Sequence, residues 1–428
     1  MKSKCILYLF LFFLFEILPA QNKQVMYGFD ESPQTLMLNP GAVVSYDRYA
    51  GMPVFSNLFF QAGVSHPDIN YNNLKPKDGE ELTKDQLLSR IYEYYKDNDF
   101  ISFRQQWELF NMGLRLKNDR FFLSFGMYQQ MEGYIKNPED ILNLMYPDDI
   151  ENEDDLLELN KHLGNLLGVF HFGVSVKVTE KLNVGARFKL LSGSSQFYYP
   201  FQTLGENVKD NSSILKVFIP SITQSVKEVY PGMFFGDGNI GMGVDLGMTY
   251  FYSENIEINA SLLDLDYINY KDYNPIDPVL DTGETIPEEY QMPAFSASRD
   301  PVFYTSFKYK IFHPVYVNKW KSIYRDSRYV SAVEKLLTTQ FGMQTYTVFR
   351  QGSADWAVTA FASHDFNRYI STKFTYTYDA YSPVNLGLGI STHYKIFNLF
   401  ATADNLLHLF KIEESNYQSV QFGMNFVF

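Results

Sequence analysis

The stretch IGMGVDLGMTY, residues 240–250, decides the fold because its residues alternate in polarity at every position. A period of two is the period of a β-strand, in which successive side chains point to opposite faces. One face is apolar throughout, and the other consists of glycine, aspartate and threonine. A soluble sheet buries its apolar face and leaves the polar face to water. Small polar residues opposite an apolar face are compatible with a transmembrane barrel, whose exterior is apolar and whose lumen is polar.

Similar alternation recurs along the rest of the chain, as in residues 170–178 and 384–391. Counting back from Phe428 gives about 14 such segments, and an even number suits a single-chain bacterial barrel. The predicted strands are 52–65, 101–116, 120–134, 165–178, 182–197, 239–251, 255–270, 301–312, 341–350, 354–363, 369–379, 383–395, 398–410 and 417–428. The sequence therefore predicts an all-β fold, a transmembrane antiparallel β-barrel.

Within residues 255–270 the alternation changes phase at Leu262-Leu263. A β-bulge has this effect, because one extra residue re-aims every side chain after it. The strand can equally well end at this point and continue as a loop. Both interpretations stay open on the sequence.

The lengths of the connections predict how the barrel is oriented. With both termini in the periplasm, the short connections fall on the periplasmic side and the long ones outside, as is usual for such barrels. The long connections are residues 66–100, 135–164, 198–238 and 271–300. Residues 313–340 are a long connection that falls on the periplasmic side, with a short helix predicted at 331–337, unless one hairpin has been missed.

Composition fits this setting and excludes several others. The 428 residues include 38 Phe and 32 Tyr, an excess that a membrane barrel uses at its two interfaces. Lys and Arg number 36 against 49 Asp and Glu, so the net charge of −13 disfavours nucleic-acid binding. The single cysteine, Cys5, excludes a disulfide framework and a multi-cysteine zinc site.

The N-terminal 20 residues read as a secretory signal peptide. Lys2 and Lys4 precede an apolar run over residues 5–15, and residues 18–20 form a cleavage site. No later apolar stretch reaches the length of a membrane-spanning helix. We therefore expect an outer-membrane location with lipid as a partner. The barrel would occupy residues 51–428, and residues 21–50 would form a plug in its lumen; the alternative for 21–50 is a disordered periplasmic leader.

Several motifs carry a resemblance to known barrels. Leu38-Asn39-Pro40 resembles the Asn-Pro-Ala signature of the FadL-type outer-membrane transporters, which include the PorV-like proteins of Bacteroidota. Residues 239–247 with 260–265, and residues 387–390 with 400–407, resemble the central hairpin and closing strands of an uncharacterised Bacteroidota family of such barrels. The sequence departs from the signature at Gly41, where the signature has Ala, and in the 313–340 insertion.

Charged residues on the lumen side of the predicted strands are the first candidates for a site. By parity they are Arg115, Lys177, Arg187, Lys189, Asp245 and Glu257. They can line a solute path, but buried charges more often pair with one another or with a plug, and we favour pairing. Asn39 and Pro40 form the plug motif. Phe428, the last residue of the last strand, resembles the signal read by the barrel assembly machinery, although it can also be an ordinary lipid-facing side chain.

Signals for an enzyme are poor. The seven histidines are scattered, and no metal-ligating, nucleophile or phosphate-loop motif occurs, so we expect no catalysis, no cofactor and no metal. His171 and His364 are the only residues considered for catalysis. The acidic, leucine-rich loop 135–164 predicts amphipathic outer helices, or else a solvated loop without a ligand.

Two functions remain for the barrel. The first is a FadL-like channel that admits small hydrophobic or amphipathic solutes past the plug. The second, implied by the PorV-like resemblance, is a non-transporting barrel that docks a partner from a secretion system.

Overall fold

The computed structural model describes residues 23–66, 68–70, 73, 84–96, 99–117, 119–135, 164–194, 238–271, 294–323, 326–350, 353–379, 385–409 and 416–428. The predicted signal peptide and the amphipathic helices predicted in the loop 135–164 lie outside these residues. Among the described helices, none is both long and apolar enough to cross a membrane.

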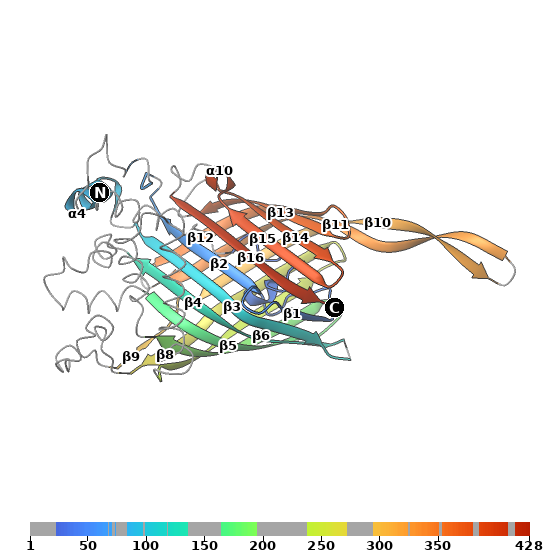
Figure 1. The fold of residues 1–428 in the computed structure, drawn as a ribbon, viewed down its shortest axis with the longest axis horizontal. Coiled ribbons are helices and arrows are strands. Elements are labelled where there is room, and N and C mark those ends of the chain that lie inside the picture. The colour runs from blue at the N-terminus through green and yellow to red at the C-terminus, as the bar shows by residue number, and fades with distance from the viewer. Residues whose placement is uncertain are drawn as a thin grey trace.

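Fourteen long strands of the described chain form one closed antiparallel sheet, as the sequence predicted (Figure 1). Each strand pairs with its neighbours in the chain, and β16 closes the barrel on β2 through pairs from Tyr417↔Gly63 to Phe422↔Leu58. The strands are β2 Asn57–Val64, β3 Ile101–Arg115, β4 Phe121–Ile135, β5 Gly164–Lys177, β6 Leu182–Ser194, β7 Ile240–Phe251, β8 Ile256–Tyr270, β10 Val302–Ile323, β11 Asp326–Arg350, β12 Ser353–Asp365, β13 Ile370–Asp379, β14 Asn385–Tyr394, β15 Phe397–Asp404 and β16 Tyr417–Val427.

The remaining described elements are short. β9 (Phe295–Ala297) pairs with the end of β8, and the helices are α2 (Thr35–Leu38), α4 (Lys84–Tyr94) and α10 (Leu406–Leu409). The predicted strand 398–410 is therefore too long at its C-terminal end, because β15 ends at Asp404 and residues 406–409 are helical.

The first predicted strand, 52–65, is wrong over residues 52–56. The chain instead forms β1 (Arg48–Gly51) and β2, and both lie between β16 and β3 at different heights of the wall. Pro53 has no N–H to give to a ladder, and Val54 has a φ of +70°, a conformation that a β-branched residue rarely adopts. The backbone of this break still bonds to both neighbours, since Val54 N donates to Leu109 O at 2.9 Å and Met424 N donates to Phe55 O at 2.8 Å.

The polarity of the barrel wall is opposite to that of a soluble protein. Large apolar side chains on β5 to β7, such as Phe172, Leu190 and Met242, are exposed on the outside, while charged side chains of the same strands are buried inside. An exposed apolar band is stable when lipid covers it, and a closed antiparallel barrel leaves no strand edge unpaired in the membrane. The chain is therefore an outer-membrane β-barrel, as the sequence predicted.

The phase change in β8 is a β-bulge, and the strand does not end there. Val244 pairs with Leu265 and Leu246 with Leu262, so Leu263 and Asp264 together oppose Asp245. Asp264 has a φ of +60°, which is tolerated better by aspartate than by most residues. After the bulge Asp266 is buried and Leu265 is exposed. The bulge therefore turns a second carboxylate into the lumen.

The two ends of the barrel differ in the length of their connections. Short turns join β3 to β4, β5 to β6 and β7 to β8 at the end that also holds the C-terminus, which marks this end as periplasmic (Figure 1). From the same end β10 and β11 project as a long hairpin. The short helix predicted at 331–337 is wrong, because this segment forms strand β11 and pairs with β10 from Asn318↔Ser331 to His313↔Leu337, with Glu334 skipped at a register shift. Cross-strand pairing overrides the local helical preference of this segment.

Residues 23–47 lie inside the lumen as a plug, as predicted for the N-terminal segment, but the predicted boundary at residue 50 is wrong, because Arg48–Gly51 form strand β1 of the wall. The plug contributes apolar side chains to three separate clusters with inward-facing barrel residues. Tyr27 stacks on Tyr304 at a centroid distance of 4.6 Å, and Met37 packs against Leu167 and Ile268. Among the described residues, much of the core is therefore formed between plug and wall.

Candidate functional site

The plug motif lies in a notch formed by two glycines of the barrel wall. Gly185 on β6 and Gly247 on β7 pair directly with each other. A Cβ atom on Gly185 would lie 2.0 Å from the Pro40 carbonyl oxygen, and one on Gly247 would lie 2.1 Å from Asn39 Oδ1. Both distances are far below van der Waals contact, so these two wall positions must lack side chains for the plug turn to approach.

Hydrogen bonds fix the same turn. Asn39 Nδ2 donates to Met248 O at 3.2 Å, and Asn183 Nδ2 donates to Gly41 O at 2.9 Å. Gly41 is itself constrained, since its Cβ would lie 2.5 Å from Gly247 O. This explains the departure from the Asn-Pro-Ala signature, because alanine at position 41 would collide with the backbone of β7.

Four of the six predicted lumen residues lie in two buried ionic groups. The first group, which we call the β6–β8 ion cluster, has three cations and three carboxylates: Arg187, Lys189, Arg299, Asp245, Asp264 and Asp266. Arg187 Nε donates to Asp245 Oδ2 at 2.7 Å, and Lys189 Nζ lies 2.7 Å from both Asp245 and Asp264. Equal numbers of opposite charges offset much of the cost of removing each ion from water.

The β6–β8 ion cluster also holds the plug. Arg187 Nη2 donates to Met37 O at 2.8 Å, and its Nη1 lies 3.0 Å from the Met37 sulfur. These contacts satisfy a carbonyl at the end of the short helix α2, which has no partner of its own there. A wall charge and a plug backbone group are thus joined in one network.

Glu257 belongs to the second ionic group. Its carboxylate forms an ion pair with Lys308 Nζ at 2.9 Å and a second ion pair with Lys310. Lys308 reaches the plug as well, where it pairs with Asp30 at 2.6 Å. The plug therefore neutralises a cation that the wall alone would leave incompletely paired.

Two further contacts fasten the plug through polar groups. Lys373 Nζ, fully buried, donates to the plug carbonyl of Tyr27 at 2.5 Å and to Gln344 Oε1 at 3.1 Å. Gln34 Nε2 donates to the buried Glu108 carboxylate at 3.0 Å, next to the break between β1 and β2. Both wall residues lie on inward-facing positions of their strands.

Lys23 begins the described part of the plug and is partly buried. Its ammonium donates to Gln106 and lies 4.6 Å above the ring of Phe59. Burial, and then the nearby Arg104, lower the pKa of Lys23 to about 7, although Glu108 acts in the opposite direction.

Arg115 and Lys177 lie apart from the other four predicted residues, at the periplasmic mouth. Arg115 pairs with Asp47 of the plug at 3.2 Å, and Lys177 pairs with Glu180 at 2.5 Å. Phe428, the predicted assembly signal, is exposed at the same end, and its N–H donates to Arg48 O. Its role in assembly stays a prediction.

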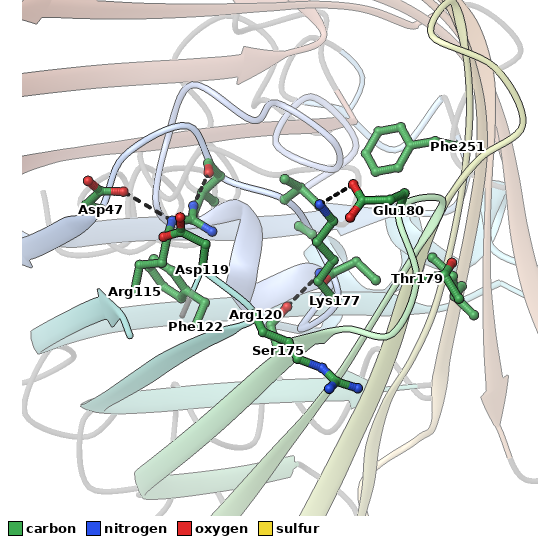
Figure 2. A pocket seen from close by; sticks show the side chains of 15 residues that line it. Asp47, Arg115, Asp119, Arg120, Phe122, Ser175, Lys177, Thr179, Glu180 and Phe251 are labelled. Carbon is green, nitrogen blue, oxygen red and sulfur yellow. Dashed lines mark hydrogen bonds and ion pairs between the residues drawn. The ribbon is translucent and has the colours of Figure 1, made fainter. Parts of the chain in front are cut away.

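A chamber of about 520 Å³ opens between the plug and the wall at this mouth. It is lined by Ala42, Val43, Val44, Asp47, Arg115, Asp119, Arg120, Phe122, Ser175, Lys177, Thr179, Glu180, Leu182, Asn183 and Phe251. Figure 2 shows Asp47 beside Arg115 and Glu180 beside Lys177 around it. The plug valines, Phe122, Leu182 and Phe251 give it apolar walls with a charged rim, a composition typical of small-molecule pockets.

Several residues of the site were missed by the sequence reasoning. Lys308 and Lys373 occupy inward positions of β10 and β13, so extending the parity argument to these strands would have found them. The inward direction of Asp264 and Asp266 could not be predicted, because the sequence left open whether the phase change in this strand is a β-bulge. Arg299 precedes β10 in irregular backbone, where no periodicity exists to indicate its direction.

The two histidines considered for catalysis show no catalytic arrangement. His171 is buried beside Tyr128, and neither of its ring nitrogens has a hydrogen-bond partner. His364 shares the hydroxyl of Thr339 with His313 near a periplasmic turn. In the part of the chain that the structure describes, no group of three or more His, Cys, Asp or Glu side chains is arranged to hold a metal.

Comparisons with solved structures return other outer-membrane barrels. The Pseudomonas putida toluene transporter TodX is 10% identical with a TM-score of 0.39, covering 96% of this chain and 97% of that chain. The monoaromatic hydrocarbon channel CymD has 10% identity and a TM-score of 0.39, covering 95% and 96%. A FadL homologue of Pseudomonas aeruginosa has 11% identity and a TM-score of 0.34, covering 93% and 94%.

Sequence comparison is more specific about the family. No curated protein matches the chain. The model of a family of unknown function, DUF5723, matches residues 40–404, from the plug motif to the end of β15. The chain therefore belongs to the family of unknown function DUF5723.

Proposed function

We propose that this protein is a plugged outer-membrane channel that admits small hydrophobic or amphipathic solutes. The observation that carries the proposal is the periplasmic chamber of about 520 Å³ between plug and wall. Its volume lies within the range of about 300–1,000 Å³ that is usual for small-molecule sites. Its apolar walls favour a solute with an apolar body, and its rim, which carries Arg115, Arg120 and Lys177 together with Asp47, Asp119 and Glu180, tolerates a polar end.

The plug supports a selective channel over an open pore. A barrel of this strand number without a plug would tend towards a water-filled lumen. Here the described lumen is filled by residues 23–47, held by the glycine notch and by ionic contacts such as Arg187 to Met37 O. We therefore expect the barrel to exclude hydrophilic solutes, while an apolar solute exchanges one apolar contact for another as it passes the plug.

The proposal is tested by narrowing the chamber. Ser175 is buried in its lining, and a Ser175→Trp substitution fills much of the space. The readout is the rate at which N-phenylnaphthylamine, a small hydrophobic dye that fluoresces in lipid, enters cells that make the protein. We expect wild type to accelerate uptake and Ser175→Trp to abolish the acceleration.

Phe172→Trp provides the matched control, because Phe172 lies on the same strand but is exposed on the lipid side. It should leave dye uptake at the wild-type rate. Equal uptake by cells with wild type and with Ser175→Trp, both correctly folded, would show that solutes do not use the chamber.

The second function considered from the sequence, docking of a secretion-system partner, remains a prediction from the PorV-like resemblance. No contact in the described residues favours that particular partner.

A further inference from the structure

The hairpin of β10 and β11 extends far beyond the barrel wall. β10 last pairs with β8 at Tyr309↔Ile256, and β11 first pairs with β12 at Thr339↔His364. The intervening parts, residues 311–323 and 326–338, pair only with each other in the described chain. At about 3.4 Å per residue, 13 residues span roughly 44 Å, more than the ~30 Å of a bilayer core. We call residues 311–338 the periplasmic ribbon (Figure 1).

Within the described parts of the chain, both strand edges of the periplasmic ribbon lack a barrel neighbour. Near its root, Pro314 lacks an N–H, and the register shifts between Val315 and Tyr316 so that Glu334 is left without a pair. Both features discourage pairing with another chain. Farther out, residues 316–323 pair with 326–333 without interruption. A ribbon of only two strands is marginally stable in water, and its open edges are templates for an added strand.

Charge indicates which strand would be added. Residues 311–338 contain five Lys and Arg against two Asp and Glu, whereas the whole chain has 36 against 49. Lys319 and Lys321 occupy alternate positions of β10, in its uninterrupted outer part. Two copies of this segment would bring like charges together, which destabilises cross-strand pairs. An acidic extended segment is complementary.

The root of the periplasmic ribbon adjoins the chamber. Lys310 Nζ lies 5.8 Å from the ring of Phe251, which lines the chamber. The root is fixed to the turn between β7 and β8, since Lys310 N donates to Asn255 O at 2.7 Å and Asn255 Nδ2 donates to Lys310 O at 2.8 Å. A protein bound to the ribbon is therefore held below the mouth of the chamber.

We propose that the periplasmic ribbon docks an acidic, extended segment of a periplasmic protein, which adds as a strand to the outer part of the ribbon. Main-chain hydrogen bonds supply the binding, and charge selects the partner. The partner class that fits this position is a soluble carrier for the hydrophobic solute released from the chamber. This last assignment rests on the proposed function, whereas the docking itself does not.

The test uses the full chain in lipid nanodiscs and a fluorescent peptide of about 10 residues with Glu at alternate positions and Thr or Val between them. Fluorescence anisotropy should show that wild type binds this peptide, more weakly as salt rises, and does not bind the counterpart with Lys in place of Glu. The same acidic peptide with N-methylated alternate amides keeps its charge but loses ladder hydrogen bonds, so it should not bind. Equal binding of the methylated peptide would overturn strand addition.

Variants of the chain locate the binding. The double variant Lys319→Glu/Lys321→Glu reverses two charges of the ribbon and should lower its affinity for the acidic peptide at least about tenfold. Lys117→Glu/Arg368→Glu is the control, since it reverses two charges in other periplasmic turns, and it should change affinity less than about twofold. Replacing residues 312–337 by an Asn-Gly turn should abolish binding. The proposal is overturned if the shortened chain binds as wild type does, if no peptide binds wild type, or if sedimentation shows that the ribbon mediates self-association.

The outcome can be separated from that of the proposed function. If the shortened chain no longer binds the peptide but still accelerates dye uptake, the docking proposal is supported and the proposed channel function is unaffected. Wild type that binds the peptide while failing to accelerate dye uptake supports docking and overturns the channel alone.

Discussion

Substituting one glycine of the notch should release the plug from the barrel. In Gly185→Ala the new Cβ would start 2.0 Å from the Pro40 carbonyl oxygen and 2.2 Å from its carbon, both backbone atoms. Ordinary contact begins near 3.4 Å, so the plug turn must move by more than 1 Å. Overpacking of this kind costs about 1–3 kcal/mol. The shift also strains the hydrogen bonds of Asn39 to Met248 O and of Asn183 to Gly41 O, each worth about 1 kcal/mol.

The total, about 3–5 kcal/mol, raises the population of the released plug by roughly 10²- to 10⁴-fold, since each 1.4 kcal/mol is about a factor of ten. A buried plug cysteine reports this population. Because Cys5 is the single cysteine of the sequence, Leu38→Cys in a Cys5→Ser background provides one buried thiol. When opening is faster than labelling, the rate of maleimide labelling follows the open fraction. We expect Gly185→Ala to raise this rate by about two to four orders of magnitude.

Gly173→Ala is the matched control on the adjacent strand. Its Cβ would crowd the Ser124 hydroxyl at 2.5 Å, a side-chain end that can rotate away, and its next nearest neighbours are wall atoms of Ala186 and Arg187 at 3.8 Å. It should leave the Leu38→Cys thiol protected. If Gly185→Ala folds into a barrel and its thiol is labelled no faster than in the control, the notch does not hold the plug.

Three further predictions concern the ion cluster, the plug and assembly. Asp245→Asn leaves Arg187 and Lys189 buried with one counter-ion fewer and should destabilise the barrel by about 3–5 kcal/mol, seen as a lower temperature of unfolding on heat-modifiability gels. Arg187→Met/Asp245→Leu should recover most of that loss, and equal damage in both variants would contradict the pairing. Burial lowers the pKa of Lys23 to about 7, whereas a lysine on a free plug titrates near pH 10, so docking releases a proton between these values. The docking equilibrium of the plug should therefore become more favourable as pH rises through this interval, by up to tenfold per pH unit, as measured by thiol labelling. The Lys23→Met variant should show no such pH dependence. A wild-type docking equilibrium that does not change with pH would contradict the lowered pKa of Lys23. Phe428→Ala should lower the fraction of chain that reaches the folded, heat-modifiable form in cells, and normal assembly would assign Phe428 to ordinary lipid contact.

The alternation of side chains along a strand determines which residues of this site could be predicted from the sequence. Arg187, Lys189 and Asp245 could be placed inside the barrel because a β-strand directs every second residue to the same face. That rule also predicts that they share a neighbourhood once β6 and β7 pair. It does not predict that Arg187 reaches a plug carbonyl, because the plug has no regular period and its position depends on contacts across more than 100 residues of sequence.

Local rules failed where backbone geometry or distant pairing decides the structure. The break at residues 52–56 follows from Pro53 and from the positive φ of Val54, and only the proline was visible in the sequence. Residues 331–337 have helix-forming residues, yet they pair with β10. The glycine notch could not be predicted, because it depends on the direct pairing of Gly185 with Gly247. That pairing is set by the register of two strands that a long loop separates in the sequence.

The central claim is that the plugged barrel admits apolar solutes and excludes hydrophilic ones. The most direct measurement compares N-phenylnaphthylamine uptake with the permeation of a small sugar, in cells that do or do not make the wild-type protein. We expect faster dye uptake and no change in sugar permeation. Free passage of the sugar would contradict a filled lumen, and unchanged uptake of the dye would contradict a hydrophobic channel.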